Sequence, residues 1–209
     1  MFEIIRPMEI EKRSFEIISS ILADMNVTLD PENEPVIKRV IHTTADFDYV
    51  NNLVFSEGAV KKGIEALKSG CDIVTDTQMA RSGISKAALS SLGGQAHCFM
   101  SDEDVAAEAK ARGVTRAAVS MEKAAGLTKP LIFAIGNAPT ALIALDELIK
   151  AGRLAPELVI GVPVGFVNVA ESKELIIASE VPHIVARGRK GGSNVAAAIV
   201  NALLYLITR

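Results

Sequence analysis

Residues 130–162 read PLIFAIGNAPTALIALDELIKAGRLAPELVIGV, and this stretch decides the fold class of the 209-residue chain. It opens and closes on short apolar runs, residues 130–135 and 157–162, that have the length and the Ile, Leu and Val content of buried strands. Between them, Pro139 fits the first turn of a helix that ends before Gly152. Because a strand, a helix and a second strand follow one another, the stretch predicts part of a parallel sheet.

The same alternation continues on both sides of this stretch. Four more apolar runs have the character of strands: residues 36–42, 71–75, 95–100 and 182–187. Cap residues and terminal glycines predict helices over residues 56–68 (with Ser56 as the cap), 101–112 and 193–207, the last of them apolar nearly all round and therefore buried. We predict one α/β domain over residues 1–209, in which a helix over 8–24 precedes a doubly wound core over 35–209 with a parallel sheet between helix layers.

The composition excludes several classes of protein. Lys and Arg number 22 against 25 Asp and Glu, so no overall positive field attracts nucleic acid or an acidic membrane. No apolar stretch approaches the roughly 20 residues of a membrane span, and the N-terminal MFEIIRPMEIEKRSF lacks the apolar core of a signal peptide. Cys71 and Cys98 lie in apolar runs without metal-binding spacing, which favours reduced core thiols and a cytoplasmic location.

The predicted N-terminal helix places a hydroxyl among apolar neighbours. At helical spacing, one face carries Ser14 together with Ile10, Ile17, Ile18 and Ile21. This spacing predicts that Ser14 points inward. It leaves two roles open, a bond to a carbonyl one turn earlier in the helix and a polar contact in a functional site.

Polar residues and glycines gather directly after the predicted strands. In an open parallel sheet, ligands bind outside the carboxyl ends of the strands, so these residues are expected to converge on one rim. The predicted rim consists of His42, Thr75, Asp76, Asn137, Gly165, Phe166, Arg187, Lys190, Gly192 and Ser193.

His42 ends the predicted strand over residues 36–42, where an imidazole is suited to donate or accept a proton near neutral pH. A lone histidine in such a position is more often a hydrogen-bonded structural residue than a catalytic one, so position alone leaves both roles open. His97 lies inside a predicted strand and His183 at the start of another, and we expect both to be structural.

A basic, glycine-rich segment, GRKGGSN at residues 188–194, directly precedes the last predicted helix. Free N–H groups and the helix dipole attract anions there, and carboxylates suit the segment as well as phosphates do. The phosphate-binding patterns GxxxxGK(S/T) and GxGxxG are both absent. The alternative to an anion-binding segment is an ordinary solvated turn. Arg116 and Lys173 are further candidates for binding acidic groups, although most such cations are solvated surface charges.

Five segments, taken in order, carry a family resemblance. They are IEKRSF (residues 10–15), RVIHTTAD (39–46), GNAPTAL (136–142), IGVPVGFV (160–167) followed by ESK (171–173), and GRKGGS (188–193). With these segments the chain resembles the precorrin-8X/cobalt-precorrin-8 methylmutase family over nearly its whole length. GNAPTAL, and GVPVGFV followed by ESK, are the specific runs.

The resemblance implies a flavodoxin-like, three-layer α/β/α fold, a homodimer and no cofactor. It implies an isomerase of cobalamin biosynthesis that moves the ring C methyl of precorrin-8 or cobalt-precorrin-8 from C-11 to C-12, giving hydrogenobyrinate or its cobalt counterpart. By matching position, His42 is implied to be the proton donor and acceptor, Ser14 a substrate-binding residue and Arg116 an active-site residue. We expect the other substrate contacts from Arg39, Lys173 and the rim. Neighbouring enzymes of the pathway are candidate partners, whereas metal ligands, nucleic acid and membranes are not expected.

Two other functions stay open at this point. A non-catalytic corrinoid carrier would bind the same macrocycle and use His42 only as a hydrogen-bonding partner. A nucleotide-binding protein of flavodoxin-like fold is disfavoured, because no phosphate loop follows the first predicted strand. The sequence does not decide whether the substrate already contains cobalt.

Overall fold

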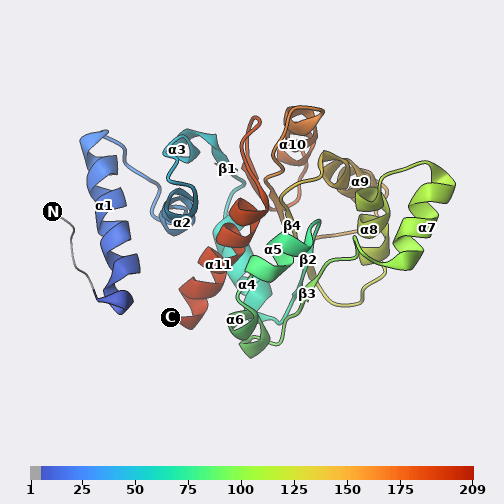
Figure 1. Ribbon diagram of the computed structural model, residues 1–209, viewed down its shortest axis with the longest axis horizontal. Coiled ribbons are helices and arrows are strands. Elements are labelled where there is room, and N and C mark those ends of the chain that lie inside the picture. The colour runs from blue at the N-terminus through green and yellow to red at the C-terminus, as the bar shows by residue number, and fades with distance from the viewer. Residues whose placement is uncertain (1–5) are drawn as a thin grey trace.

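A six-stranded sheet forms the centre of the protein in the computed structural model, which describes residues 6–209 (Figure 1). The strands are β1 (Leu53–Phe55), β2 (Asp72–Thr75), β3 (Ala96–His97), β4 (Leu131–Ile135), β5 (Leu158–Gly161) and β6 (His183–Ala186). They lie in the order β1-β6-β5-β4-β2-β3, and all neighbouring pairs are parallel except β1 with β6. Numbered along the chain, the five parallel strands have the order 2-1-3-4-5, which is that of flavodoxin and related doubly wound sheets.

Helices cover both faces of this sheet, which confirms the predicted three-layer α/β architecture (Figure 1). After a short 3-10 turn, η1 (Pro7–Glu9), they are α1 (Ile10–Asp24), α2 (Glu34–Thr44), α3 (Tyr49–Asn52), α4 (Ala59–Lys68), α5 (Gln78–Gly83), α6 (Lys86–Ser91), α7 (Glu103–Arg112), α8 (Arg116–Ala124), α9 (Pro139–Lys150), α10 (Val169–Ile177) and α11 (Ser193–Thr208).

Alternate residues of the buried strands feed two hydrophobic cores, as the period of a strand requires. Ile132 and Ile160 belong to the core shared with α4 and α11, whereas Phe133 and Val159 belong to the core shared with α8 and α9. Helix α11 is buried along most of its length, as its apolar sequence predicts, and packs on α2, α4 and α5. Helix α1 packs on α2 and forms the outer edge of the molecule (Figure 1).

The predicted strand over residues 36–42 is wrong, because this segment lies in helix α2. Pro35 occupies the first turn and Ala45, in the left-handed conformation, ends the helix. The buried residues fall in pairs one helical turn apart, a spacing that a strand cannot bury on one face: Val36, Ile37, Val40 and Ile41. The real first strand, β1, has three residues at the antiparallel edge of the sheet and is too short for a recognisable pattern.

Several helix ends lie where caps were predicted. Pro139 opens α9, and α7 begins after Asp102 and ends at Gly113. The predicted Ser56 cap of α4 is wrong: Gly58 precedes the first turn, and the Ser56 hydroxyl accepts a bond from the His183 N–H at 2.9 Å, joining β6 to the loop after β1.

The apolar face predicted for the N-terminal helix is only partly buried. Ile18 lies in the core, but Ile10, Ile17 and Ile21 remain 54%, 43% and 36% exposed, so α1 presents an apolar stripe outward. Residues 1–5 of the predicted domain lie outside the described residues. They include the start of MFEIIRPMEIEKRSF, the segment that was not expected to be a signal peptide. Within residues 6–209, no helix has the length and apolar character needed to cross a bilayer.

Candidate active site

Asp76, directly after β2, holds the carboxyl edge of the sheet together. It lies beside β4, where the strand order reverses and where doubly wound sheets bind ligands. The side chain is fully buried, and its carboxylate accepts N–H bonds from Gly136, Asn137 and Ala138 at 2.8, 2.7 and 2.6 Å. Burial raises the pKa of this carboxyl group, although the three bonds favour its charged form. Asp76 therefore shapes the loop that carries the exposed Asn137 and reaches a ligand only indirectly.

Thr75 and Ser193 belong to the same packed rim. The Thr75 hydroxyl is buried 3.1 Å from the carbonyl oxygens of Thr77 and His97. Ser193 opens α11 and places its hydroxyl 2.7 Å from that of Thr77. Gly136 leaves no room for a side chain, since a Cβ atom there would lie 2.6 Å from the Cα of Ser193. The ends of β2 and β4 and the start of α11 thus converge, as predicted.

Lys173, on α10, lies beneath the loop that follows β6. Its side chain is fully buried, and Nζ donates to the carbonyl oxygens of Gly188 and Lys190, both at 2.8 Å. Among the described residues no carboxylate pairs with this amine, and burial lowers its pKa to about 8. Lys173 therefore fixes the backbone of the loop from below, and it does not face the rim.

Two rim loops touch through bare backbone at Gly191. Its φ is +157°, and a Cβ atom there would lie 2.1 Å from the carbonyl oxygen of Val162. The N–H of Gly192 donates to that same oxygen at 2.9 Å, and the N–H of Gly165 donates to the Arg189 carbonyl at 3.2 Å. The loop after β5 and the loop after β6 are therefore joined along their main chains, and only glycine fits at position 191.

The cations predicted for this rim are already paired. Arg187 forms a two-pronged ion pair with Glu174 of α10, at 2.8 and 3.1 Å. Lys190 donates to Asp46 and Asp48, both at 2.6 Å. The Asp46 carboxylate, followed by Asp48, keeps the pKa of the Lys190 amine above its ordinary value. These pairs tie the loop after β6 to α10 on one side and to the segment after α2 on the other.

Large apolar side chains stand exposed beside this loop. Phe166 and Val167 are 83% and 78% exposed, and the Arg189 guanidinium lies 5.7 Å from the centre of the Phe166 ring. Adjacent exposed apolar groups with a cation beside them suit contact with a ligand or partner that is apolar and acidic.

His42 lies in the last turn of α2, not at the end of a strand. Its ring is exposed, and Nδ1 lies 2.8 Å from the hydroxyl oxygen of Ser14 on α1. The Phe15 ring stacks on the imidazole with centres 5.3 Å apart and planes inclined by 17°. The Ser14 hydroxyl therefore has a side-chain partner on another helix, and this contact leaves Nε2 of the imidazole open.

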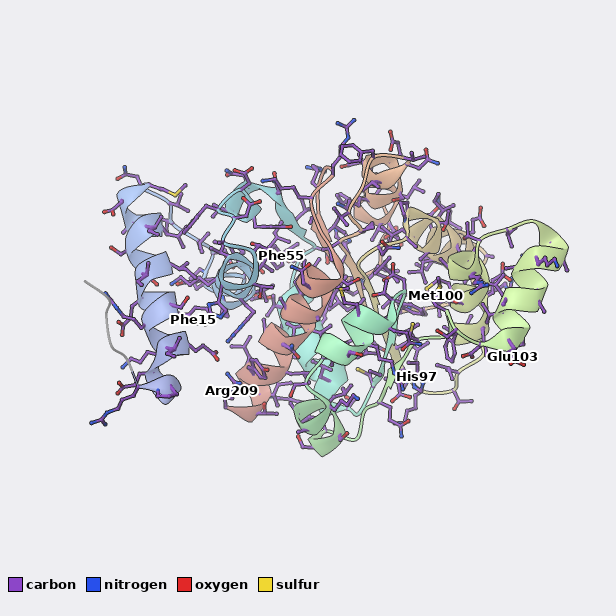
Figure 2. All side chains as sticks on the ribbon, in the orientation of Figure 1. Phe15, Phe55, His97, Met100, Glu103 and Arg209 are labelled. Carbon is purple, nitrogen blue, oxygen red and sulfur yellow. The ribbon has the colours of Figure 1, made fainter. Side chains whose placement is uncertain are left out.

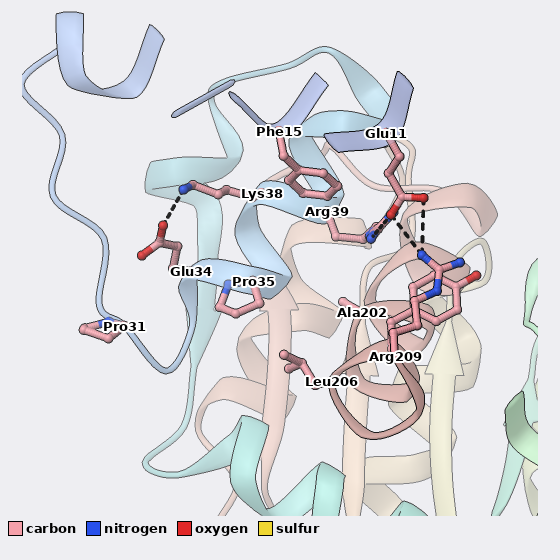
Figure 3. Close-up of a pocket in the computed structure, with 11 residues that line it drawn as sticks. Glu11, Phe15, Pro31, Glu34, Pro35, Lys38, Arg39, Ala202, Leu206 and Arg209 are labelled. Atoms are coloured by element: carbon pink, nitrogen blue, oxygen red, sulfur yellow. Dashed lines mark hydrogen bonds and ion pairs between the residues drawn. The ribbon is translucent and has the colours of Figure 1, made fainter. Parts of the chain in front are cut away.

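Arg39 lies one turn before His42, on the wall of a cavity of about 410 Å³ between α1, α2 and the end of α11 (Figure 3). The close-up shows Arg39 and Arg209 both joined to Glu11, with Phe15 above them. The Phe15 and Arg209 side chains lie between α1 and the end of α11 (Figure 2). Phe15 was not among the predicted site residues, although its position next to Ser14 in the sequence was a usable signal.

Arg116 lies far from His42 in the same chain. It opens α8, near the end of the molecule formed by α7, whereas α1 and α2 form the opposite end (Figure 1). Its side chain is exposed, on the rim of an open depression of about 650 Å³ that also carries Lys110. The neighbouring Thr115 hydroxyl donates to Thr140 at 2.9 Å and so joins α8 to the first turn of α9. One chain therefore does not bring Arg116 and His42 together.

The fold and site define a doubly wound α/β protein with an exposed histidine on α2, a helix whose following segment is joined to the loop after β6 by the Lys190–Asp46 ion pair. Within the described residues, no group of three or more His, Cys, Asp or Glu side chains is arranged to hold a metal ion. A family model described as CbiC: Precorrin-8X methylmutase matches residues 9–206. The chain belongs to the precorrin-8X methylmutase family, as the sequence motifs indicated, and is therefore an enzyme of the isomerase class.

Individual relatives agree with this assignment. The cobalt-precorrin-8 methylmutase of Salmonella typhimurium is 48% identical over 98% of both chains. That of Priestia megaterium is 46% identical over 97% of this chain and 89% of its own. A crystal structure of precorrin-8x methyl mutase from Thermus thermophilus has a TM-score of 0.86 at 38% identity, covering 95% of this chain and 96% of that one.

Proposed function

We propose that this enzyme moves the ring C methyl of cobalt-precorrin-8 from C-11 to C-12, with His42 as the proton donor and acceptor. The observation that carries the proposal is the Ser14–His42 pair, an exposed imidazole with one nitrogen held by a hydroxyl at 2.8 Å. The cobalt-loaded substrate is favoured because both curated relatives above are named for it. Metal-free precorrin-8 is the alternative substrate.

The proton balance of this reaction needs only one residue. In the protonated imidazole, Nδ1–H donates to the Ser14 oxygen and Nε2–H faces the substrate. Transfer of the Nε2 proton to a ring nitrogen or conjugated carbon draws electron density from the macrocycle and assists the methyl shift. The neutral imidazole then takes the proton back. The methyl group never leaves the substrate, so neither a methyl donor nor a nucleophile is required.

The surroundings of the rim suit a flat macrocycle with acidic side chains. Phe166 and Val167 offer an apolar wall next to Gly165. Asn137 offers a polar group before α9, and Gly192 and Ser193 offer polar groups at the start of α11. Lys190 and Arg187 would reach substrate carboxylates by exchanging their present partners. Lys173 would act through the loop backbone that it holds.

Arg116 leads us to propose that the enzyme acts as a homodimer. If Arg116 and His42 serve one substrate, the arginine must come from a second copy, because the two lie toward opposite ends of one chain (Figure 1). The outward apolar stripe of α1, next to Ser14, suits burial against such a copy. We further propose a cytoplasmic location, in keeping with the free thiols of Cys71 and Cys98.

The deciding experiment compares wild type with His42→Ala on cobalt-loaded and metal-free precorrin-8, followed by absorption spectra. We expect the variant to bind the macrocycle but to convert it at least about 100-fold more slowly. Thr43→Ala, an exposed neighbour on the same turn, is the control and should turn over normally. Normal conversion by His42→Ala would refute the acid–base role. Binding without conversion by the wild type would favour the carrier.

A further inference from the structure

Five side chains form a continuous stack that begins at His42, and we call this stack the His42 column. The Phe15 ring lies on the imidazole, with ring centres 5.3 Å apart. The Arg39 guanidinium lies 4.7 Å from the centre of the Phe15 ring and 5.2 Å from that of Tyr205. The Arg209 guanidinium closes the stack 3.6 Å from the Tyr205 ring centre.

Glu11 holds both arginines of the His42 column from the side. Its carboxylate accepts from Arg39 Nη2 at 2.6 Å and from Arg209 Nη1 at 3.0 Å (Figure 3). The hydrogen bond from Arg39 is the main reason that the pKa of the Glu11 carboxyl lies below its ordinary value. Three helices, α1, α2 and α11, thus contribute to one connected unit.

The contacts of Arg39 leave little of it for a ligand. Phe15 and Tyr205 cover the guanidinium, Glu11 binds its edge, and its side chain is only 15% exposed. A planar, delocalised cation can stack between two rings in this way, whereas a lysine ammonium cannot. Arg39 was expected to contact substrate, but its geometry favours a task inside the protein.

We propose that Arg39 is a positioning residue that holds the His42 ring through Phe15. The imidazole is exposed and has two contacts that orient it: the Ser14 hydroxyl at Nδ1 and the Phe15 ring stacked on its plane. The plane of the His42 ring therefore follows the plane of the Phe15 ring. The Arg39 guanidinium lies 4.7 Å from the centre of the same ring, and in this proposal it restrains Phe15 from turning away. This inference rests on the proposed role of His42.

The first test measures His42 in the free enzyme, without substrate. Nitrogen and carbon NMR of the imidazole reports its tautomer ratio, its titration and its ring order in wild type, Arg39→Lys, Phe15→Leu and Phe15→Tyr. We expect Arg39→Lys and Phe15→Leu to shift these signals in the same direction and Phe15→Tyr to preserve them. Lys38→Gln is the matched control, because Lys38 lies beside Arg39 on the same cavity but outside the His42 column.

The second test separates positioning from substrate binding by kinetics. For Arg39→Lys we expect kcat to fall about tenfold while KM stays within about twofold, since a misplaced acid–base group slows the reaction without weakening binding. A raised KM with unchanged kcat and unchanged His42 NMR signals would overturn the proposal and make Arg39 a substrate ligand.

A third variant, Glu11→Gln, tests the proposal if Arg39→Lys does not fold. Glu11→Gln weakens the hold on Arg39 from a side chain that is 42% exposed, and it should produce a smaller shift of the same His42 signals. Unchanged signals in both Glu11→Gln and Phe15→Leu would also overturn the proposal. These results are separate from the His42→Ala assay, whose failure would remove the acid–base role itself.

Discussion

The hydroxyl oxygen of Ser14 lies 2.8 Å from Nδ1 of His42, although 28 positions separate the two residues in the chain. The contact joins α1 to α2 and engages Nδ1, so Nε2 is the ring nitrogen that the proposed function assigns to the substrate. Ser14 was expected to bind substrate, and in the structure its hydroxyl group contacts His42.

Replacing Ser14 tests this contact. Ser14→Ala should lower kcat about 10- to 100-fold, because the imidazole loses the partner that fixes its tautomer and orientation. The measurement is steady-state conversion of precorrin-8. Ser20→Ala, an exposed serine on the same helix, should leave kcat unchanged. Equal rates for Ser14→Ala and wild type would show that the bond does not orient His42.

Lys173 predicts a pH dependence of stability. Its pKa is about 8 in the folded protein, against 10.5 for an ordinary lysine. Between these values the unfolded chain binds more protons, so the free energy of unfolding should rise with pH, by at most about 3 kcal/mol from this residue. Urea unfolding from pH 7 to 10.5 measures it.

The variant Lys173→Met should be less stable at high pH and should lack this rise. Lys150→Met is the control, since that lysine is exposed and pairs with Asp146 one turn away. If the free energy of unfolding of Lys173→Met rose with pH as steeply as that of wild type, Lys173 would not be the source of the pH dependence.

Asp76 should be among the costliest carboxylates to replace. Asp76→Asn puts an amide NH₂ against backbone N–H donors and leaves some of them without an acceptor, so the free energy of unfolding should fall by about 2–4 kcal/mol. Asp146→Asn, also buried but, among residues 6–209, bonded through its side chain only to the exposed Lys150, should cost under about 1 kcal/mol. If the free energy of unfolding fell by a similar amount in the two variants, the three N–H bonds to Asp76 would not contribute more to stability than the single bond of Asp146.

Arg116 and His42 predict complementation between subunits. His42→Ala and Arg116→Ala should each be nearly inactive. Unfolded together and refolded as mixed dimers, they should recover about a quarter of wild-type activity, because half of the dimers then contain one intact site. If both residues served one site within a single chain, mixing would restore nothing.

Much of the fold could be predicted from local pattern, and the residues show why. The unit β4–α9–β5 was predicted because strand length, Pro139 and Gly152 each give a local signal. Helix α2 was missed because its β-branched residues resemble a buried strand. The decisive spacing, Val36 with Val40 and Ile37 with Ile41, is visible in the sequence and favours a helix.

The site was less predictable because its contacts join distant parts of the chain. Asp76 binds N–H groups 60 to 62 positions away, and Lys190 binds a carboxylate 144 positions away. Such pairings depend on how the elements pack, and no local spacing encodes them. Strand-end position therefore located Thr75, Asp76 and Asn137 at the carboxyl edge of the sheet, but it placed His42 on a strand that does not exist. It also could not show that Arg187 and Lys190 are already paired or that Lys173 is buried.

The bare backbone contact at Gly191 has a mechanical consequence. Without a methyl group at this position, the segment that carries Phe166 and the segment that carries Lys190 rest directly on each other and are joined by main-chain hydrogen bonds. Lys190 in turn grips Asp46, just beyond the helix of His42. These contacts link the Phe166 segment to the end of that helix, and a substrate carboxylate that drew Lys190 away from Asp46 would break the link.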